Sequence, residues 1–166
     1  MAKETERKFL LNDDSWRTLV HSSAFFCQAY IPTLPGRKHI TARVRLAGEK
    51  AFLTLKNSPA ESSSFSRSEF EYPIPAEDAK ILLEEFCGKK VEKTRHIVFH
   101  EGNKWEIDEF SGDNQGLIIA EIELQSENSV FIKPAFLGKE VTFDYRYSNS
   151  FLAENPYCTW EKKEEK

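Results

Sequence analysis

The chain has 166 residues, of which 30% are charged and 40% hydrophobic, and its formal net charge is −4. This length and composition are typical of one soluble globular domain, and the negative charge argues against nonspecific nucleic-acid binding. The sequence contains no membrane-spanning apolar run and no signal-peptide pattern, so we expect a cytoplasmic protein.

Residues 4–11 are predicted to form the first strand. Because alternate side chains of a strand point to the same face, Glu4, Glu6 and Lys8 share one face. Two neighbouring carboxylates favour a divalent cation between them, and the lysine is placed to meet an anion bound to that cation. The alternative is a solvated edge strand with mixed charges.

The next predicted elements are a short helix at 16–23 and strands at 26–31, 39–46, 51–56 and 65–73, with a polar loop at 59–64. The clearest helix follows Pro75 and ends near Gly88, with a buried stripe at Ala79, Ile81, Leu82, Leu83 and Phe86. Further strands are predicted at 91–100, 104–110 and 117–125. A short helix from Pro134, a capped helical segment at 148–154 and a charged tail complete the chain.

Charged residues recur at alternate positions along nearly every predicted strand. Arginine dominates the strand at 39–46, whereas a solubilising face usually mixes lysine and glutamate. The amphipathic helices need an apolar sheet face to cover, so we expect the charged face to close into an interior. Since buried charges are costly unless they are paired, the acids should hold a divalent cation and the bases a polyphosphate.

These motifs resemble the CYTH domain, in the triphosphate tunnel metalloenzyme superfamily. The matching residues, in the family's order, are Glu4-x-Glu6-x-Lys8, Arg43-x-Arg45, Thr54-x-Lys56, Glu69-x-Glu71, Lys93-x-Arg95, Asp108 and Glu121-x-Glu123. The resemblance implies a mainly antiparallel β (α+β) fold: an eight-stranded closed barrel forming a charged tunnel, with helices packed outside. This domain would span residues 1–157, with a charged C-terminal tail at 158–166.

The chain is most similar to the small inorganic tripolyphosphatases, which implies metal-dependent hydrolysis of tripolyphosphate to pyrophosphate and phosphate. The implied substrate-binding residues are Lys8, Arg43, Arg45, Lys56, Lys93 and Arg95. The implied ligands of Mg²⁺ or Mn²⁺ are Glu4, Glu6, Asp108, Glu121 and Glu123, with Glu69 and Glu71 as further tunnel acids. Tyr30 and Lys56 match a tyrosine and a lysine that are proposed to help activate water in those enzymes.

Two other enzyme activities remain open in the same fold, namely a class IV-type adenylate cyclase and a thiamine or nucleoside triphosphatase. A nonenzymatic polyphosphate-binding module is disfavoured, because binding an anion does not need so many carboxylates. We find no motif for reading a base, so tripolyphosphate is expected to be preferred over ATP. The expected partner is a small-molecule polyphosphate, with no nucleic acid or membrane, and the sequence does not decide between a monomer and a homodimer.

Overall fold

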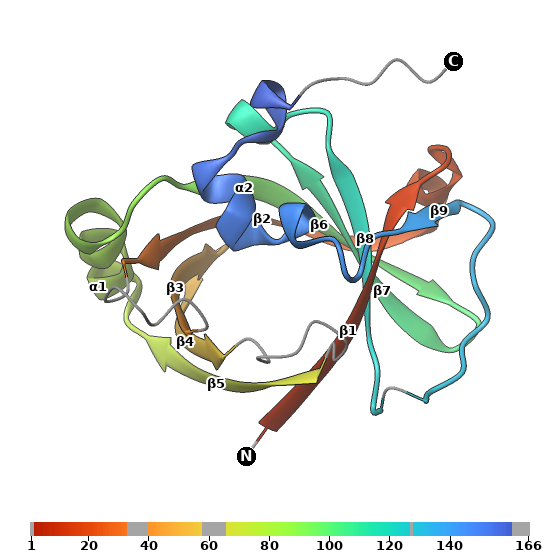
Figure 1. Cartoon of the computed structure of the whole chain (residues 1–166), viewed down its shortest axis with the longest axis horizontal. Helices are drawn as coiled ribbons and strands as arrows, with labels where there is room; N and C mark the ends of the chain where they lie inside the picture. Colours follow the sequence, from red (N-terminus) through yellow and green to blue (C-terminus); the bar gives the residue numbers. More distant parts are fainter. Residues whose placement is uncertain (1, 33–39, 58–65, 127, 161–166) are drawn as a thin grey trace.

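The computed structural model describes residues 2–32, 40–57, 66–126 and 128–160, and these form one antiparallel sheet of nine strands (Figure 1). The strands are β1 (Ala2–Leu11), β2 (Val20–Ile31), β3 (Ile40–Ala47), β4 (Lys50–Asn57), β5 (Ser66–Ile74), β6 (Val91–His100), β7 (Asn103–Phe110), β8 (Ile118–Glu123) and β9 (Leu137–Glu140). Their order in the sheet is β5-β4-β3-β2-β6-β7-β8-β1-β9. Sequential hairpins therefore make up most of the sheet.

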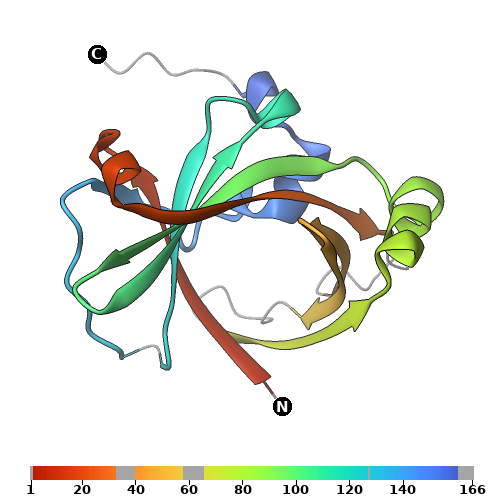
Figure 2. The same cartoon turned by 180° about the vertical axis from the view of Figure 1, so that it is seen from behind.

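The predicted eight-stranded closed barrel is wrong, because the described sheet has a ninth strand and ends at β9, beside β1. The sheet curls strongly, and an additional short pairing joins Ala2–Thr5 of β1 to Ser66–Glu69 of β5. Farther along, β1 pairs with β8 and then also with β9. The outcome is a tunnel-like sheet, seen from both sides in Figures 1 and 2.

Residues 137–140 form β9 instead of the short helix predicted after Pro134. The segment passes very close to β1, since a Cβ atom on Gly138 would lie 2.7 Å from Asn12 Oδ1 and 3.3 Å from the Leu10 carbonyl oxygen. Asn12 Nδ2 also donates a hydrogen bond to the Leu137 carbonyl oxygen at 3.0 Å. A glycine permits this close backbone approach, and the resulting pairing outweighs local helix propensity.

The helix predicted at 16–23 is a single 3-10 segment, η1 (Ser15–Leu19), and β2 begins at Val20. The side chain of Trp16 is fully buried, which anchors this segment. Ser22 and Ser23 pair with Ile97 and His96 of β6. Pairing with β6 thus extends β2 back over residues that helical spacing had suggested were helical.

The helix after Pro75 is split into α1 (Ala76–Ile81) and one π-helical turn, η2 (Leu82–Phe86). Ala79 and Leu83 are buried in a cluster with residues of β2, β3 and β4, but Ile81 and Phe86 are 51% and 55% exposed, so the predicted apolar stripe is only partly correct. A π-turn changes the angular spacing of the side chains that follow it. Phe86 is thereby turned away from the face that holds Leu83.

Buried apolar side chains lie on the sheet face that the helices and the C-terminal segments cover. One group includes Phe9, Trp105 and Ile122, and alternates along β1, β7 and β8 with charged residues of the other face. A second packs under α2 (Asn149–Glu154), with η3 (Gly112–Asn114), η4 (Tyr145–Tyr147) and η5 (Tyr157–Thr159) nearby. The helical segment predicted at 148–154 is confirmed, with the Ser148 hydroxyl accepting from the Phe151 amide at 3.2 Å.

Two predicted segments, the polar loop at 59–64 and the charged residues at 161–166, lie outside the described part of the chain. Within that part, no helix is both long enough and apolar enough to span a bilayer.

Candidate functional site

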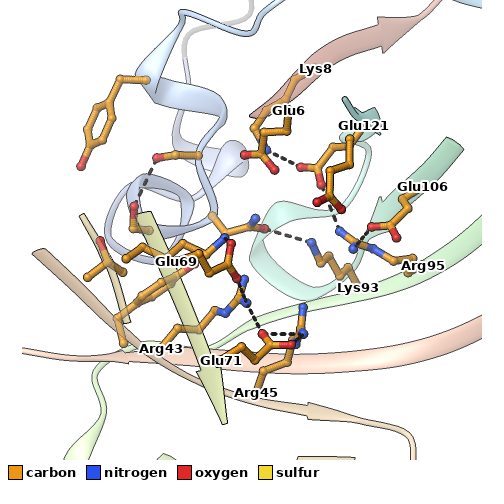
Figure 3. A pocket seen from close by; sticks show the side chains of 18 of the residues that line it. Glu6, Lys8, Arg43, Arg45, Glu69, Glu71, Lys93, Arg95, Glu106 and Glu121 are labelled. Carbon is orange, nitrogen blue, oxygen red and sulfur yellow. Dashed lines mark hydrogen bonds and ion pairs between the residues drawn. The ribbon is translucent and has the colours of Figure 1, made fainter. Parts of the chain in front are cut away.

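A cavity of about 580 Å³ lies on the concave side of the sheet and is bordered by the start of α2 (Figure 3). All strands from β1 to β8 contribute to its wall, because alternate residues of each strand point inward. The charged lining residues are Lys8, Arg43, Arg45, Lys56, Lys93, Arg95, Lys104, Glu6, Glu69, Glu71, Glu106, Glu121 and Glu123. Seven cationic and six acidic side chains therefore share one enclosed space.

One cluster in the wall joins β3, β4 and β5. The strand register places Arg43 opposite Thr54 and Thr54 opposite Glu71. The Glu71 carboxylate accepts hydrogen bonds from Nη2 of Arg43 at 3.1 Å and from Nη2 of Arg45 at 3.0 and 3.1 Å. Thr54 Oγ1 donates to the same carboxylate at 2.8 Å. Two guanidinium groups are thus gathered around one acid.

A second cluster centres on Asp108 of β7. Its Oδ1 accepts from Arg95 Nε at 2.7 Å, and its Oδ2 accepts from Arg95 Nη2 at 2.7 Å and from the Lys93 ammonium group. Lys93 Nζ also lies 3.3 Å from Asn149 Oδ1 at the start of α2. Asp108 and Lys93 are almost completely excluded from solvent.

The acids of β1, β7 and β8 surround this second cluster. Arg95 pairs with Glu106 and, through Nη2, with Glu121 Oε2 at 3.1 Å. Lys8 pairs with Glu121 and lies 3.1 Å from Glu6 Oε1. Cross-strand register explains these contacts, since Glu121 lies between Lys8 of β1 and Glu106 of β7.

Tyr30 and Lys56, the residues proposed for water activation, line the same cavity. The Tyr30 hydroxyl accepts a hydrogen bond from Gln28 Nε2 at 2.8 Å, and Gln28 is itself buried. Lys56 Nζ lies 2.9 Å from Glu69 Oε2. A hydrogen bond therefore orients the Tyr30 side chain, and an ion pair orients that of Lys56.

Burial and ion pairing shift the pKa values of Lys93 and Glu121 in opposite directions. Burial lowers the pKa of Lys93 to about 8, although the adjacent Asp108 opposes this shift. Burial alone would raise the pKa of Glu121, but Lys8 and Arg95 hold it well below its usual range. Burial, reinforced by the neighbouring Arg43, lowers the pKa of Arg45. The cavity therefore strongly perturbs several of its titratable groups, as functional sites often do.

The structure brings twelve of the fourteen predicted site residues to the cavity wall: Glu6, Lys8, Tyr30, Arg43, Arg45, Lys56, Glu69, Glu71, Lys93, Arg95, Glu121 and Glu123. Asp108 is not part of the wall, because it is fully buried with its carboxylate bound to Lys93 and Arg95. The side chain of Glu4 is outside the described part of the structure, although its backbone belongs to β1.

Sequence reasoning did not assign several other lining residues to the site, including Glu106, Lys104, Tyr145 and Asn149. A signal existed for Glu106 and Lys104, which alternate with Asp108 on one face of β7. Tyr145 and Asn149 gave no such signal, because they reach the cavity only when the C-terminal segment folds back over the sheet.

Four acids of the wall are candidates for holding a divalent cation. Glu6 faces Glu123 across β1 and β8, and Glu121 faces Glu106 across β8 and β7. Carboxylate oxygens are the donors that Mg²⁺ and Mn²⁺ prefer, so the donor chemistry fits. Within the described residues, no three acidic, histidine or cysteine side chains converge on one point, and three of the four acids contact Lys8 or Arg95 instead.

A curled antiparallel sheet with seven cationic and six acidic side chains around one cavity defines a tunnel-like, mainly β protein with a charged interior. The chain belongs to the CYTH domain family, whose model matches residues 2–150.

Several known proteins are similar to this chain. An inorganic triphosphatase of Acetivibrio thermocellus is 46% identical over 158 residues, which cover 95% of this chain and 97% of that protein. An inorganic triphosphatase of Nitrosomonas europaea is 37% identical over 117 residues, covering 69% of this chain and 75% of that protein. The crystal structure of the inorganic triphosphatase NE1496 superposes with a TM-score of 0.62 at 33% identity, covering 92% of this chain and 95% of that one.

Proposed function

We propose that this chain hydrolyses inorganic tripolyphosphate to pyrophosphate and phosphate, with a divalent cation bound in the cavity. The observation that carries the proposal is the convergence of two forked guanidinium groups, Arg43 and Arg45, with four lysines and Arg95 on one enclosed space. Guanidinium groups match phosphate oxygens in pairs, and several cations in line suit a compact linear polyanion. The similarity to inorganic triphosphatases over nearly the whole chain supports the same substrate.

Charge balance supports the use of a metal. The wall carries seven cationic and six acidic side chains, which leaves it close to neutral. A triphosphate brings several negative charges into this space, and unpaired buried charges cost several kcal/mol each. Divalent cations that enter with the substrate would offset this excess, and Glu6, Glu106, Glu121 and Glu123 are the acids we propose as their ligands. Glu4, whose side chain is not described, stays a sequence-based candidate.

The roles of the remaining residues follow from phosphoryl-transfer chemistry, in which positioning and charge neutralisation do most of the catalysis. We assign Arg43, Arg45, Lys8, Lys93 and Arg95 to binding the phosphate oxygens. A divalent cation, when bound, would act as a Lewis acid and offset negative charge on those oxygens.

Water attacks the terminal phosphorus in line with the bridging oxygen, and the bond to pyrophosphate breaks. We assign Tyr30 and Lys56 to orienting that water, and its protons end on the oxygens of the released phosphate. The Gln28 amide fixes the Tyr30 hydroxyl for this role.

The test is phosphate release by the purified protein from tripolyphosphate, thiamine triphosphate and ATP, each with Mg²⁺, Mn²⁺ or a chelator. We expect the highest specificity constant for tripolyphosphate and loss of turnover with the chelator. Cyclic AMP among the products of ATP, or turnover that persists in the chelator, would contradict the proposal.

A further inference from the structure

Asp108 is a buried carboxylate on the same face of β7 as the cavity-lining Glu106. Its side chain is 0% exposed and is not part of the lining, whereas Lys93 and Arg95 are. The register places Asp108 opposite Arg95, and Lys93 lies two residues before Arg95 on the same face of β6. One carboxylate therefore supports two of the cavity's cations.

Both oxygens of Asp108 are already used. Oδ1 and Oδ2 each accept one hydrogen bond from Arg95, at 2.7 Å from Nε and Nη2, and Oδ2 also accepts from the Lys93 ammonium group. Paired hydrogen bonds along one edge of a guanidinium group fix the plane of that group. The other edge of Arg95 is then directed to Glu106 and Glu121, which line the cavity.

A metal ligand needs an oxygen lone pair that a cation can reach from the binding space. Glu6, Glu106, Glu121 and Glu123 belong to the cavity wall, but Asp108 is fully buried and both its oxygens are paired with Lys93 or Arg95. We propose that Asp108 is a positioning residue that orients Lys93 and Arg95 toward the phosphate groups of the substrate and does not coordinate the metal. This inference rests on the proposed function, because the anion it concerns is tripolyphosphate.

The first test compares Asp108→Asn with Glu123→Gln in two calorimetric titrations, one with tripolyphosphate in a chelator and one with Mn²⁺ alone. Asp108→Asn should weaken metal-free tripolyphosphate binding about tenfold or more, which corresponds to about 1.4 kcal/mol, and leave Mn²⁺ affinity within about twofold of the parent. Glu123→Gln should show the opposite pattern. A loss of Mn²⁺ affinity in Asp108→Asn as large as in Glu123→Gln would overturn the proposal.

A mutant cycle with Lys93→Met shows whether Asp108 acts through its partners. If it does, the losses in tripolyphosphate affinity from Asp108→Asn and Lys93→Met are less than additive in the double variant. Additive losses would indicate an independent effect and contradict positioning. Asp108→Asn alone leaves the buried Lys93 without its acid and could prevent folding. The double variant replaces both residues and so can be measured even if Asp108→Asn does not fold. In that case the double variant should still bind more weakly than Lys93→Met, because Arg95 has lost its support, and equal affinity would overturn the proposal.

Binding and hydrolysis separate this inference from the proposed function. A parent protein that binds tripolyphosphate but does not release phosphate would refute the triphosphatase activity and leave the role of Asp108 standing. Unchanged tripolyphosphate affinity in a folded Asp108→Asn variant, with full hydrolysis by the parent, would refute the role of Asp108 alone.

Discussion

Arg43 and Glu71 meet across β4, with Arg43 Nη2 3.1 Å from Glu71 Oε2 and the Thr54 hydroxyl bonded to both. Arg45 contacts the same carboxylate, so one acid of the chain holds the two guanidinium groups to which we expect phosphate oxygens to bind. Substrate must therefore displace or share these contacts. This relationship allows predictions of opposite sign for neighbouring residues.

Substitution of Arg43 or Arg45 by alanine should weaken tripolyphosphate binding, and lysine should restore only part of the affinity, because a point charge does not reproduce a forked contact. We expect a loss of about tenfold or more for either alanine variant by calorimetry. Arg17→Lys is the matched control, since Arg17 makes a similar forked contact with Glu109 outside the cavity. Lysine variants that bind as tightly as the parent would exclude a forked phosphate contact.

Glu71→Gln should have the opposite effect on affinity. Loss of the negative charge releases Arg43 and Arg45, so tripolyphosphate should bind several-fold more tightly, by the same electrostatic argument. The melting temperature should fall, because two largely buried guanidinium groups lose their acid. Both quantities can be measured on one preparation, with Glu140→Gln, in a surface pair with Arg7, as the control. Weaker binding would show that Glu71 helps to hold the ligand.

Glu6→Gln and Glu123→Gln should leave the fold intact and reduce metal-dependent turnover about a hundredfold, because a neutral amide is a much poorer ligand for a hard cation. Melting temperature and turnover should be followed together as Mn²⁺ is titrated. Glu109→Gln, on the other face of β7, provides the control. Full turnover by a folded Glu123→Gln variant at low Mn²⁺ would remove this residue from the metal site.

The buried Lys93 should leave a signature in the pH dependence of stability. Its pKa falls from 10.5 in the unfolded chain to about 8 in the folded protein, chiefly through burial. Between these values the unfolded state binds more protons, so this lysine makes the free energy of unfolding rise with pH over that window. Chemical unfolding of Lys93→Met at several pH values should lack this contribution, whereas the exposed Lys80→Met should retain it. Identical pH profiles for the parent and Lys93→Met would contradict the prediction.

Tripolyphosphate should be preferred over ATP, because the described wall is dominated by charged groups rather than by surfaces for a base. Of the two tyrosines in the described wall, Tyr145 is the more exposed, at 66%, and it contacts Phe151 edge-to-face at a centroid distance of 5.3 Å. Tyr145→Ala should therefore leave the specificity constant for tripolyphosphate unchanged and lower that for ATP. A higher specificity constant for ATP than for tripolyphosphate in the parent protein would contradict the predicted substrate preference.

The period of two in a strand explains how far the sequence could predict the site. It places Lys93 and Arg95 on one face without knowledge of the fold, and it correctly groups them with Arg43 and Glu71. The period does not predict how deeply a side chain is buried. Asp108 and Glu106 lie on the same face of β7, so the sequence could not show that only Glu106 lines the cavity.

The elements that sequence reasoning missed depend on distant contacts. The four residues of β9 carry no alternating pattern and become a strand only by pairing with Phe9 and Leu11. Likewise, Asn149 reaches Lys93 across 56 positions of sequence. Neither contact leaves a local signal, because both are created when the C-terminal part of the chain packs onto the sheet.

The cavity can be completed only late in folding, because β1 pairs with strands that lie far along the chain. Residues of β1 pair with β5, β8 and β9, and Lys8 contacts Glu121, which lies 113 positions later in the sequence. Closing such long loops slows folding into the range of milliseconds to seconds typical of β-rich topologies. Until these pairings form, the backbone edges of β1 are unpaired and the charged cavity is incomplete.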